Sequence, residues 1–305
     1  MIKVTGNIEA RIENDAVPNE RNTILVEEAE VVSTKAYDGA QYALRLHAPR
    51  VAARSKAGHF VHLRCAPELW LRRPMSIMRA NSKHGWIDIL FKAHGTGTKL
   101  LAKRNIGDIV SLIGPIGKPF KQETYCRRPL LIGGGVGIPP IVFLAEHLRE
   151  RSVNPFVIMG SEVPFPFPVT PSQILVDGIP NYVTGTMPLM EDWGIPCRLA
   201  SRQGFAGCFD GFVTELATHW IEFQREEHKE EIEVFACGPT LMLKTVAGIA
   251  RQFNLKCQVS LEEFMACGLG GCAGCPIEVR TSQGAAMKRV CVDGPVFESA
   301  DVIFA

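Results

Sequence analysis

One stretch organises this chain: Cys267-Gly-Leu-Gly-Gly-Cys272-Ala-Gly-Cys275, followed by Cys291. It holds four of the ten cysteines, in the spacing C-x4-C-x2-C-x15-C. Four thiolates can complete two tetrahedral iron sites that share bridging sulfides, and this spacing is that of plant-type 2Fe–2S proteins. The glycines between the first three cysteines let a loop wrap closely round such a cluster. The stretch therefore predicts a 2Fe–2S cluster.

Two other interpretations of the cysteines stay open at this point. Zinc sites usually combine two short C-x2-C pairs, whereas this run contains one. A pair of structural disulfides is the second alternative. We favour the iron–sulfur interpretation because the spacing and the glycines agree on it.

The composition is that of an ordinary soluble protein with two or three domains. The 305 residues are 46% hydrophobic and 21% charged, and the formal net charge of +1 gives no sign of a nucleic-acid partner. No apolar run approaches the ~18 residues that span a bilayer, and the N-terminus lacks the apolar region of a signal peptide. We therefore expect a cytoplasmic protein without a membrane partner, whose six other cysteines are free thiols.

The first half of the chain predicts an antiparallel barrel. Residues 1–22 are polar and form an expected N-terminal extension, and residues 23–124 form the expected barrel domain. Short β-rich runs separated by turn residues are typical of such a barrel. The expected strands are Ile24–Val32, Gln41–His47, His59–Arg64, Gly85–Phe91 and Asp108–Ile113, with a short helix over Thr98–Ala102.

From Pro129 the pattern alternates between strands and helices, which indicates a parallel sheet in an α/β domain over residues 125–258. The expected elements are strands Leu130–Ile132, Pro155–Met159 and Glu233–Cys237, and helices Ile141–Leu148 and Thr240–Phe253. Residues 161–206 contain seven of the twenty prolines. We interpret them as an insert that packs on the sheet as a loop; a docking surface or lid is the alternative.

Residues 259–305 form the expected cluster domain. The segment is too small to bury much core alone, so the metal centre is expected to hold it together. Its expected strands are Pro276–Arg280 and Lys288–Cys291. The fold class is therefore α+β with several domains: an antiparallel barrel, a parallel α/β sheet and a small 2Fe–2S domain.

Two features of the barrel segment favour a phosphate-containing ligand. Arg72-Arg73-Pro74-Met75-Ser76 offers an Arg that can bind a phosphate with both arms and a Ser that can bind a ring nitrogen. Leu90-Phe-Lys-Ala-His-Gly-Thr-Gly-Thr98 places glycines before a helix, where free N–H groups face an anion. Each feature alone also fits a solvated strand end or an ordinary capped turn.

A third feature predicts a dinucleotide. Gly133-Gly-Gly-Val-Gly137 lies after a strand and before a helix, as a pyrophosphate site requires, and Cys237-Gly238-Pro239 forms a second wall at the same sheet edge. Packing of the helix on the strand is the alternative role for these glycines. Glu162 follows the next strand, where a carboxylate favours a ribose 2′-hydroxyl, so we expect NAD rather than NADP.

The eight histidines show no metal spacing and no nucleophile–base pair. His94 is the one of interest, because it precedes the glycine loop of the barrel. We expect no catalytic side chain, since the cofactors would carry the chemistry.

In this order, the motifs resemble the ferredoxin–NAD(P) reductase superfamily, and more closely the electron transfer subunits of class 1B dihydroorotate dehydrogenases. The resemblance covers roughly residues 24–160 and 207–305. It implies FAD contacts at one set of barrel residues: Arg73, Pro74, Met75, Ser76, Leu90, Phe91, Lys92, Gly97 and Thr98. The predicted NAD(H) site consists of Gly133, Gly134, Gly135, Gly137, Cys237, Gly238 and Pro239, and the implied cluster ligands are Cys267, Cys272, Cys275 and Cys291.

The resemblance further implies an oxidoreductase subunit of pyrimidine biosynthesis. Electrons would pass from dihydroorotate to FMN in a separate catalytic subunit, then to the 2Fe–2S cluster, to FAD and to NAD⁺, within a heterotetramer of two subunits of each kind. The alternative is a reductase subunit of a hydrogenase, a sulfur reductase or a ferredoxin-linked NAD(P)H oxidoreductase. A redox sensor without nucleotide turnover is a third hypothesis. Met75 stands where many reductases of the superfamily carry an aromatic residue.

Overall fold

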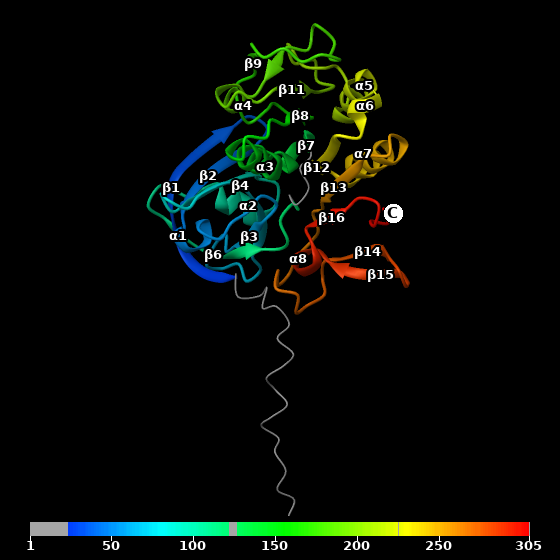
Figure 1. Ribbon diagram of the computed structural model, residues 1–305. Helices are drawn as coiled ribbons and strands as arrows, with labels where there is room; N and C mark the ends of the chain where they lie inside the picture. The colour runs from blue at the N-terminus through cyan, green and yellow to red at the C-terminus, as the bar shows by residue number, and fades with distance from the viewer. Residues whose placement is uncertain (1–23, 122–126, 225, 305) are drawn as a thin grey trace, which may run out of the picture.

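The computed structural model describes residues 24–121, 127–224 and 226–304 (Figure 1). The expected N-terminal extension 1–22 lies outside these residues. Within them, no helix has both the length and the apolar character needed to cross a membrane.

Six antiparallel strands close into a barrel in the order β1-β2-β5-β4-β3-β6. The strands surround a core of leucines and isoleucines, such as Leu44 and Ile89. Strand β3 and the middle of β5 are buried throughout, whereas β2 buries Leu44 and Leu46 and leaves the residues between and beside them more exposed. The strands are β1 (Leu25–Tyr37), β2 (Gln41–His47), β3 (Phe60–Leu63), β4 (Arg73–Asn81), β5 (Trp86–Lys92) and β6 (Ile109–Ile116). Two short helices, α1 (Pro49–Ala52) and α2 (Thr96–Leu101), connect them. The predicted barrel is confirmed.

The second body is a six-stranded sheet in the order β11-β8-β7-β12-β13-β16. The first five strands are parallel and β16 is antiparallel to β13. They are β7 (Arg128–Gly134), β8 (Phe156–Gly160), β11 (Cys197–Ala200), β12 (Ile232–Cys237), β13 (Lys256–Ser260) and β16 (Val296–Glu298). The parallel strands are almost completely buried, as strands covered on both faces must be.

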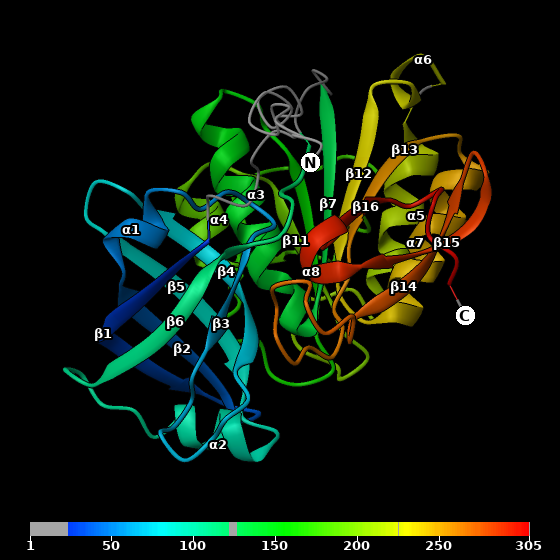
Figure 2. The same cartoon turned by 90° about the horizontal axis from the view of Figure 1, so that it is seen from below.

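Helices cover both faces of this sheet (Figure 2). Helix α3 (Ile138–Glu150), preceded by the 3₁₀ turn η3 (Gly135–Gly137), lies on the face toward the barrel. Helices α5 (Val213–Phe223) and α7 (Thr240–Gln252) lie on the other face, and α6 (Glu226–Lys229) is a short turn near the sheet. The predicted α/β sheet is confirmed.

The proline-rich segment 161–206 differs from the prediction, because its last part is a strand of the main sheet. Cys197–Ala200 forms β11, which pairs in parallel with β8. The short elements before it are β9 (Thr170–Pro171), β10 (Gly185–Thr186) and α4 (Pro188–Asp192). The prolines around this four-residue run, and the buried Arg198 within it, hide the strand in the sequence. Only the part of the segment before β11 is therefore an insert.

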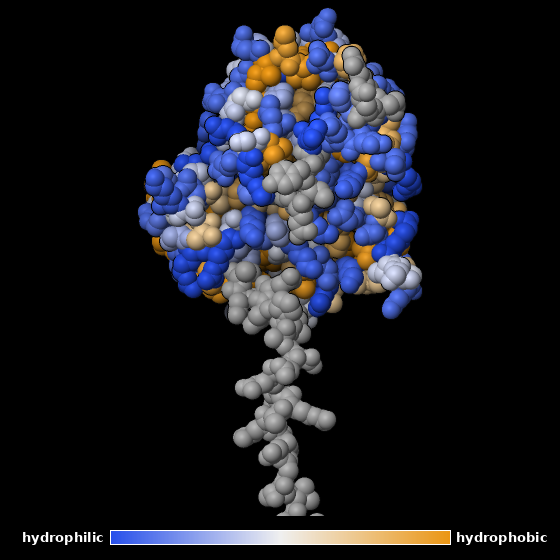
Figure 3. Space-filling model, viewed as in Figure 1, coloured by the Kyte–Doolittle hydropathy of each residue, from blue (hydrophilic) through white to orange (hydrophobic). Residues whose placement is uncertain are grey.

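This insert packs against the barrel. The Gln41 side-chain amide donates a hydrogen bond of 2.7 Å to the carbonyl oxygen of Pro164. The ring of Phe165 is buried and lies 5.3 Å from that of Phe167 and 6.1 Å from that of Phe205. Figure 3 shows an apolar patch at the top of the molecule, over the region of β9, and Leu175 of this segment is 93% exposed. The insert thus contributes to the core on one side and leaves apolar side chains on the other.

The C-terminal segment contains a hairpin of β14 (Pro276–Thr281) and β15 (Gly284–Arg289), the short helix α8 (Val290–Asp293) and then β16. The expected strand Lys288–Cys291 is wrong in its second half, because Cys291 lies in α8. Strand β16 belongs to the main sheet, and Val290 and Val302 are buried in the same apolar cluster as that sheet. Packing, in addition to any metal, therefore holds this segment in place.

A largely buried ion pair joins the barrel to the sheet domain. The Arg79 guanidinium on β4 donates hydrogen bonds of 3.0 and 3.2 Å from Nε to the two carboxylate oxygens of Glu146 on α3. The same guanidinium lies 5.4 Å from the Trp86 ring and 5.1 Å from the Trp193 ring. Because both charged side chains are largely buried, removing one leaves the other without its partner.

We predict that Arg79→Gln lowers the free energy of unfolding by about 2 kcal/mol, since Glu146 would lose a charge-assisted bidentate bond in a largely buried place. Urea unfolding followed by tryptophan fluorescence measures the change. Lys121→Gln is the matched control, because the Lys121–Glu298 pair is exposed and its loss should stay below about 0.5 kcal/mol. Equal effects of the two substitutions would contradict the role given to Arg79.

A second prediction concerns acid. Burial, helped by the charge of Lys56, lowers the pKa of His59 from 6.5 to about 4. As pH falls, the unfolded chain binds a proton at this position first. His59 therefore lowers stability progressively between about pH 6.5 and pH 4, by roughly 3 kcal/mol in total, and has no effect above that range. Chemical unfolding at several pH values measures the free energy of unfolding of the original protein and of His59→Gln. Between pH 6.5 and pH 4 this free energy should fall less steeply in His59→Gln. Parallel pH profiles for the two proteins would refute the pKa given to His59.

Candidate functional site

The cysteine loop is shaped by residues with positive φ. Gly268 and Gly270 have φ of +66° and +82°, and Ala273 has φ of +50°. These left-handed turns fold the backbone back on itself so that N–H groups face sulfur. The Leu269 N–H lies 3.3 Å from Cys267 Sγ, and the Gly274 N–H lies 3.4 Å from Cys272 Sγ. Sulfur ligands of a metal cluster are stabilised by such hydrogen bonds.

The four predicted ligands are brought together as two pairs. Cys267 is hydrogen-bonded to the Cys272 side chain, and Cys275 Sγ lies 3.4 Å from Cys291 Sγ. Across the residues that the structure describes, no group of three His, Cys, Asp or Glu side chains is placed to hold one metal ion. Two pairs fit two irons that share sulfides better than they fit a single four-thiolate zinc ion.

The thiols of the loop differ in acidity. Burial opposes ionisation of Cys267, but backbone hydrogen bonds from Leu269, Cys272 and Gly271 outweigh it and lower its pKa to about 6. Burial and the neighbouring Cys275 thiol raise the pKa of Cys291 to about 12. Cys267 is thus ready to bind a metal as thiolate, whereas Cys291 would lose its proton only when a metal replaces it.

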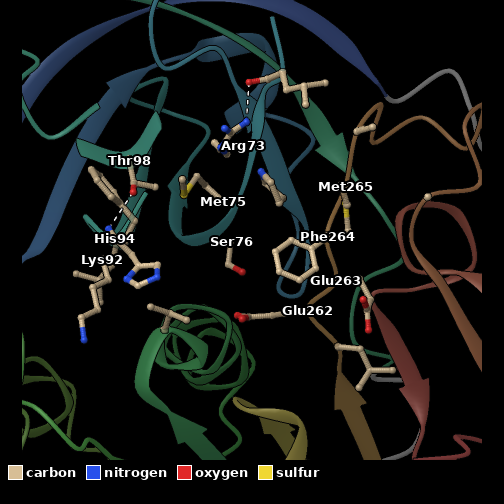
Figure 4. Close-up of a pocket in the computed structure, with 18 of the residues that line it drawn as sticks. Arg73, Met75, Ser76, Lys92, His94, Thr98, Glu262, Glu263, Phe264 and Met265 are labelled. Atoms are coloured by element: carbon tan, nitrogen blue, oxygen red, sulfur yellow. Dashed lines mark hydrogen bonds between the residues drawn. The ribbon is translucent and has the colours of Figure 1, made fainter. Parts of the chain in front are cut away.

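A cavity of about 1090 Å³ lies between the barrel, the carboxyl edge of the sheet and the segment that leads to the cysteine loop (Figure 4). Eight of the nine barrel residues predicted to contact FAD line it: Arg73, Pro74, Met75, Ser76, Leu90, Phe91, Lys92 and Thr98. A Cβ atom on the ninth, Gly97, would come within 3.0 Å of Arg73 Nε. Glycine at position 97 therefore leaves room for the guanidinium.

The polar groups on the barrel side are held in place by local hydrogen bonds. Arg73 Nη1 donates to the Leu71 carbonyl at 2.9 Å. The Thr98 hydroxyl accepts hydrogen bonds from the N–H groups of His94 and Gly95, at 3.0 and 3.1 Å, and so begins α2. His94 also lines the cavity. Arg73 lines the cavity, and Figure 4 shows the Ser76 side chain directed into it.

The predicted dinucleotide residues meet at the sheet edge, beside this cavity rather than in its lining. A Cβ on Gly137 would lie 2.3 Å from the Cys237 carbonyl oxygen, so the glycine loop and the Cys237–Pro239 turn are in close contact. Gly137 therefore has the packing role that the sequence left open. Gly135 has φ of +55° and open space in front of it, as a loop that binds a ligand requires. Cys237 is fully buried, and burial raises its pKa well above the usual range, so its thiol is inert.

One wall of the cavity consists of residues that were not predicted from the sequence. Residues 261–266, at the carboxyl end of β13, line it together with Val136, Thr240 and Gly274. Phe264 is 93% exposed to this space. Glu262 lines the cavity and is exposed to it, and desolvation by the surrounding protein still raises the pKa of its carboxyl group. Figure 4 shows Glu262 and Ser76 pointing into the same part of the cavity. Their position directly before Cys267 in the sequence is the signal that could have predicted that these residues lie near the cofactors.

The chain was compared with known families. Residues 262–303 match the iron–sulfur cluster binding domain of dihydroorotate dehydrogenase B, and residues 23–120 match the oxidoreductase FAD-binding domain. The chain is 33% identical to the dihydroorotate dehydrogenase B (NAD(+)) electron transfer subunit of Caldanaerobacter subterraneus subsp. tengcongensis, over 81% of this chain and 87% of that protein. It is 30% identical to the Bacillus cereus protein of the same name, over 93% of this chain and 98% of the relative.

Solved structures show the same fold. The NADH-dependent reduced ferredoxin–NADP oxidoreductase, a structure concerned with flavin-based electron bifurcation, superposes with a TM-score of 0.72 and 26% identity, over 91% of this chain and 90% of the other. Phthalate dioxygenase reductase superposes with a TM-score of 0.54 over 88% of this chain and 77% of the other. At 16% identity the latter shows the fold alone.

We predict that Cys272→Ser removes one cluster ligand, because a serine hydroxyl is a poor substitute for thiolate at iron. Iron content and the paramagnetic signal of the reduced cluster should fall, while the bound flavin is kept. Gly271→Ala is the control, since its added methyl group meets open space. A normal iron signal in Cys272→Ser would disprove the ligand assignment.

Proposed function

Because this chain belongs to the family of dihydroorotate dehydrogenase B electron transfer subunits, we propose that it passes electrons between an FMN-containing catalytic subunit and NAD(H). The carriers within the chain are a 2Fe–2S cluster and FAD. One observation supports this most directly. A single cavity is bounded by Arg73–Ser76 of the barrel, by Val136 and Thr240 at the sheet edge, and by Gly274 of the cysteine loop. Most of the predicted FAD residues therefore line this space, and neighbours of the predicted NAD(H) and cluster residues close it.

The barrel wall has the chemistry to hold FAD. Arg73 supplies a guanidinium for the pyrophosphate, and Ser76 a hydroxyl for the edge of the ring system. Met75, only 7% exposed, offers a soft thioether against a ring face. When bound, FAD links the two-electron hydride chemistry of a nicotinamide to the one-electron steps of an iron–sulfur cluster.

The sheet edge supplies the nicotinamide side. Val136 and Thr240, which follow β7 and β12, line the same cavity as Ser76. A dinucleotide whose pyrophosphate binds at the Gly133–Gly137 loop would therefore reach the FAD with its nicotinamide. Glu262 closes this space on the third side. Desolvation by the surrounding protein raises the pKa of its carboxyl group.

The cysteine loop is the part of the chain through which electrons would pass to or from a partner subunit. Gly274 lines the cavity, while Cys272 on the same loop is exposed and Leu269 is 47% exposed. One side of the loop thus faces the flavin space and the other faces the surface. We place the catalytic subunit on the exposed side, in a cytoplasmic complex of two subunits of each kind that serves pyrimidine biosynthesis.

The similarity to the ferredoxin–NADP oxidoreductase supports a second candidate, in which the same cofactors serve a ferredoxin-linked partner. The two candidates differ in the partner and not in the site. The curated relatives favour the first.

The test is purification of the chain from its native host without oxygen, followed by identification of its flavins and partner. We expect FAD and iron on this chain, FMN on a co-purifying flavoprotein, and reduction of NAD⁺ when dihydroorotate is added. A chain without flavin and iron would overturn the proposal. A complex that reduces ferredoxin and leaves dihydroorotate unchanged would establish the second candidate, and rapid bleaching of the flavin by NADH would exclude a mere sensor.

A further inference from the structure

The shape of the site fixes where the adenosine half of a dinucleotide must lie, and this inference rests on the proposed function. The pyrophosphate site follows β7. The cavity extends from there over the ends of β12 and β13, because Thr240 and Glu262 line it. The nicotinamide takes that side, so the adenosine half must extend the other way. In the order β11-β8-β7-β12-β13, that direction leads over the carboxyl ends of β8 and β11.

A hydrogen bond connects the segments that follow these two strands, and the exposed polar residues beside it form one small surface. The Ser201 hydroxyl, after β11, donates a hydrogen bond of 2.7 Å to the Ser161 carbonyl, after β8. Both serines are buried, whereas the next residues, Glu162 and Arg202, are exposed. Because Gly160 of β8 pairs with Ala200 of β11, Glu162 and Arg202 each follow the end of one of two neighbouring strands. That is the sheet edge at which the ribose of the dinucleotide would lie.

The two charged groups are not equally available. The Glu162 carboxylate accepts a hydrogen bond of 3.5 Å from the Gln203 side-chain amide. The Arg202 guanidinium lies over the ring of Phe212, 5.2 Å from its centroid. Stacking on an aromatic ring orients a guanidinium while it leaves the donors at its edge available. Within the described residues, Arg202 takes part in no ion pair of the structure.

We infer that this surface binds a 2′-phosphate on the adenosine ribose, with Arg202 as the residue that holds it. The sequence suggested a preference for the 2′-hydroxyl from Glu162 alone. In the structure, β11 brings an arginine to the same place, and an arginine at the ribose edge accommodates a 2′-phosphate. The chain thus accepts NADP(H) as well as NAD(H), and the 2′-phosphate strengthens binding. Glu162 opposes it by like charge.

The test uses adenosine nucleotides that lack nicotinamide, so that it does not depend on the flavin or the cluster. Calorimetric titration of the purified holoprotein compares 2′,5′-ADP with 5′-ADP. We expect 2′,5′-ADP to bind about tenfold more tightly, as one charge-assisted bidentate contact predicts. High salt should reduce this difference, since the site is exposed.

Three variants separate the contributions. Arg202→Gln should abolish the difference between the two nucleotides, and should lower the ratio of NADPH to NADH efficiency in flavin bleaching by about tenfold. Glu162→Gln should tighten 2′,5′-ADP by about threefold. Arg251→Gln is the control, because Arg251 is an exposed arginine at the far end of α7, and it should leave both ratios unchanged.

The outcomes distinguish this inference from the proposed function. If 5′-ADP binds and NADH bleaches the flavin, but 2′,5′-ADP binds no more tightly, the inference is wrong and the proposed function stands. If Arg202→Gln retains the full preference for 2′,5′-ADP, Arg202 is not the residue that holds the phosphate. If neither nucleotide binds and neither cofactor bleaches the flavin, both the inference and the nucleotide part of the proposed function fail.

Discussion

The guanidinium of Arg79 fixes the relation between barrel and sheet, and the rest of the site depends on that relation. It is held by a carboxylate from α3 and lies near two tryptophan rings, one from each body. Arginine suits this position because its planar fork matches a carboxylate while its faces stack on aromatic rings. Together with the hydrogen bond from Gln41 to the Pro164 carbonyl, this ion pair holds the barrel against the sheet domain. The cavity is lined by residues of both bodies, so its shape depends on that arrangement.

Much of the fold could be predicted, because the local signals agreed with the tertiary structure. The strand Gln41–His47 was located to the residue, since it has one face in the core and one toward solvent. Strand β13 was missed for the opposite reason. Its central residue, Gln258, is 3% exposed, and its side-chain amide donates a hydrogen bond of 3.1 Å to the Glu233 carboxylate. A polar residue therefore occupies a buried position. No periodicity in one sequence reveals a polar group that is satisfied by a partner 25 positions away.

The site was predictable where a residue type has few uses. Four cysteines in a fixed spacing have few alternative roles, and the structure brings the four together as two pairs. Glu262 and Arg202 were not singled out, because a glutamate or an arginine on its own is an ordinary surface residue. Their possible roles in binding follow from their positions at the ends of strands. Which strand ends lie together depends on the order of the strands in the sheet. In the sheet, β11 lies beside β8 and β13 lies beside β12. Neither β11 nor β13 was recognised as a strand in the sequence, because of the prolines and the buried polar residues.

The path of the chain around the cysteine loop has one more consequence. Strand β13 leads into the loop and β16 leads out of it, and the two are antiparallel neighbours. The Leu261 N–H donates a hydrogen bond of 2.9 Å to the Pro295 carbonyl, which closes the neck between them. Topologically, everything from Glu262 to Gly294 is an elaborate hairpin connection. The segment that carries the four predicted ligands is thus one insertion between two neighbouring strands of the main sheet, and both of its ends are held at the same place.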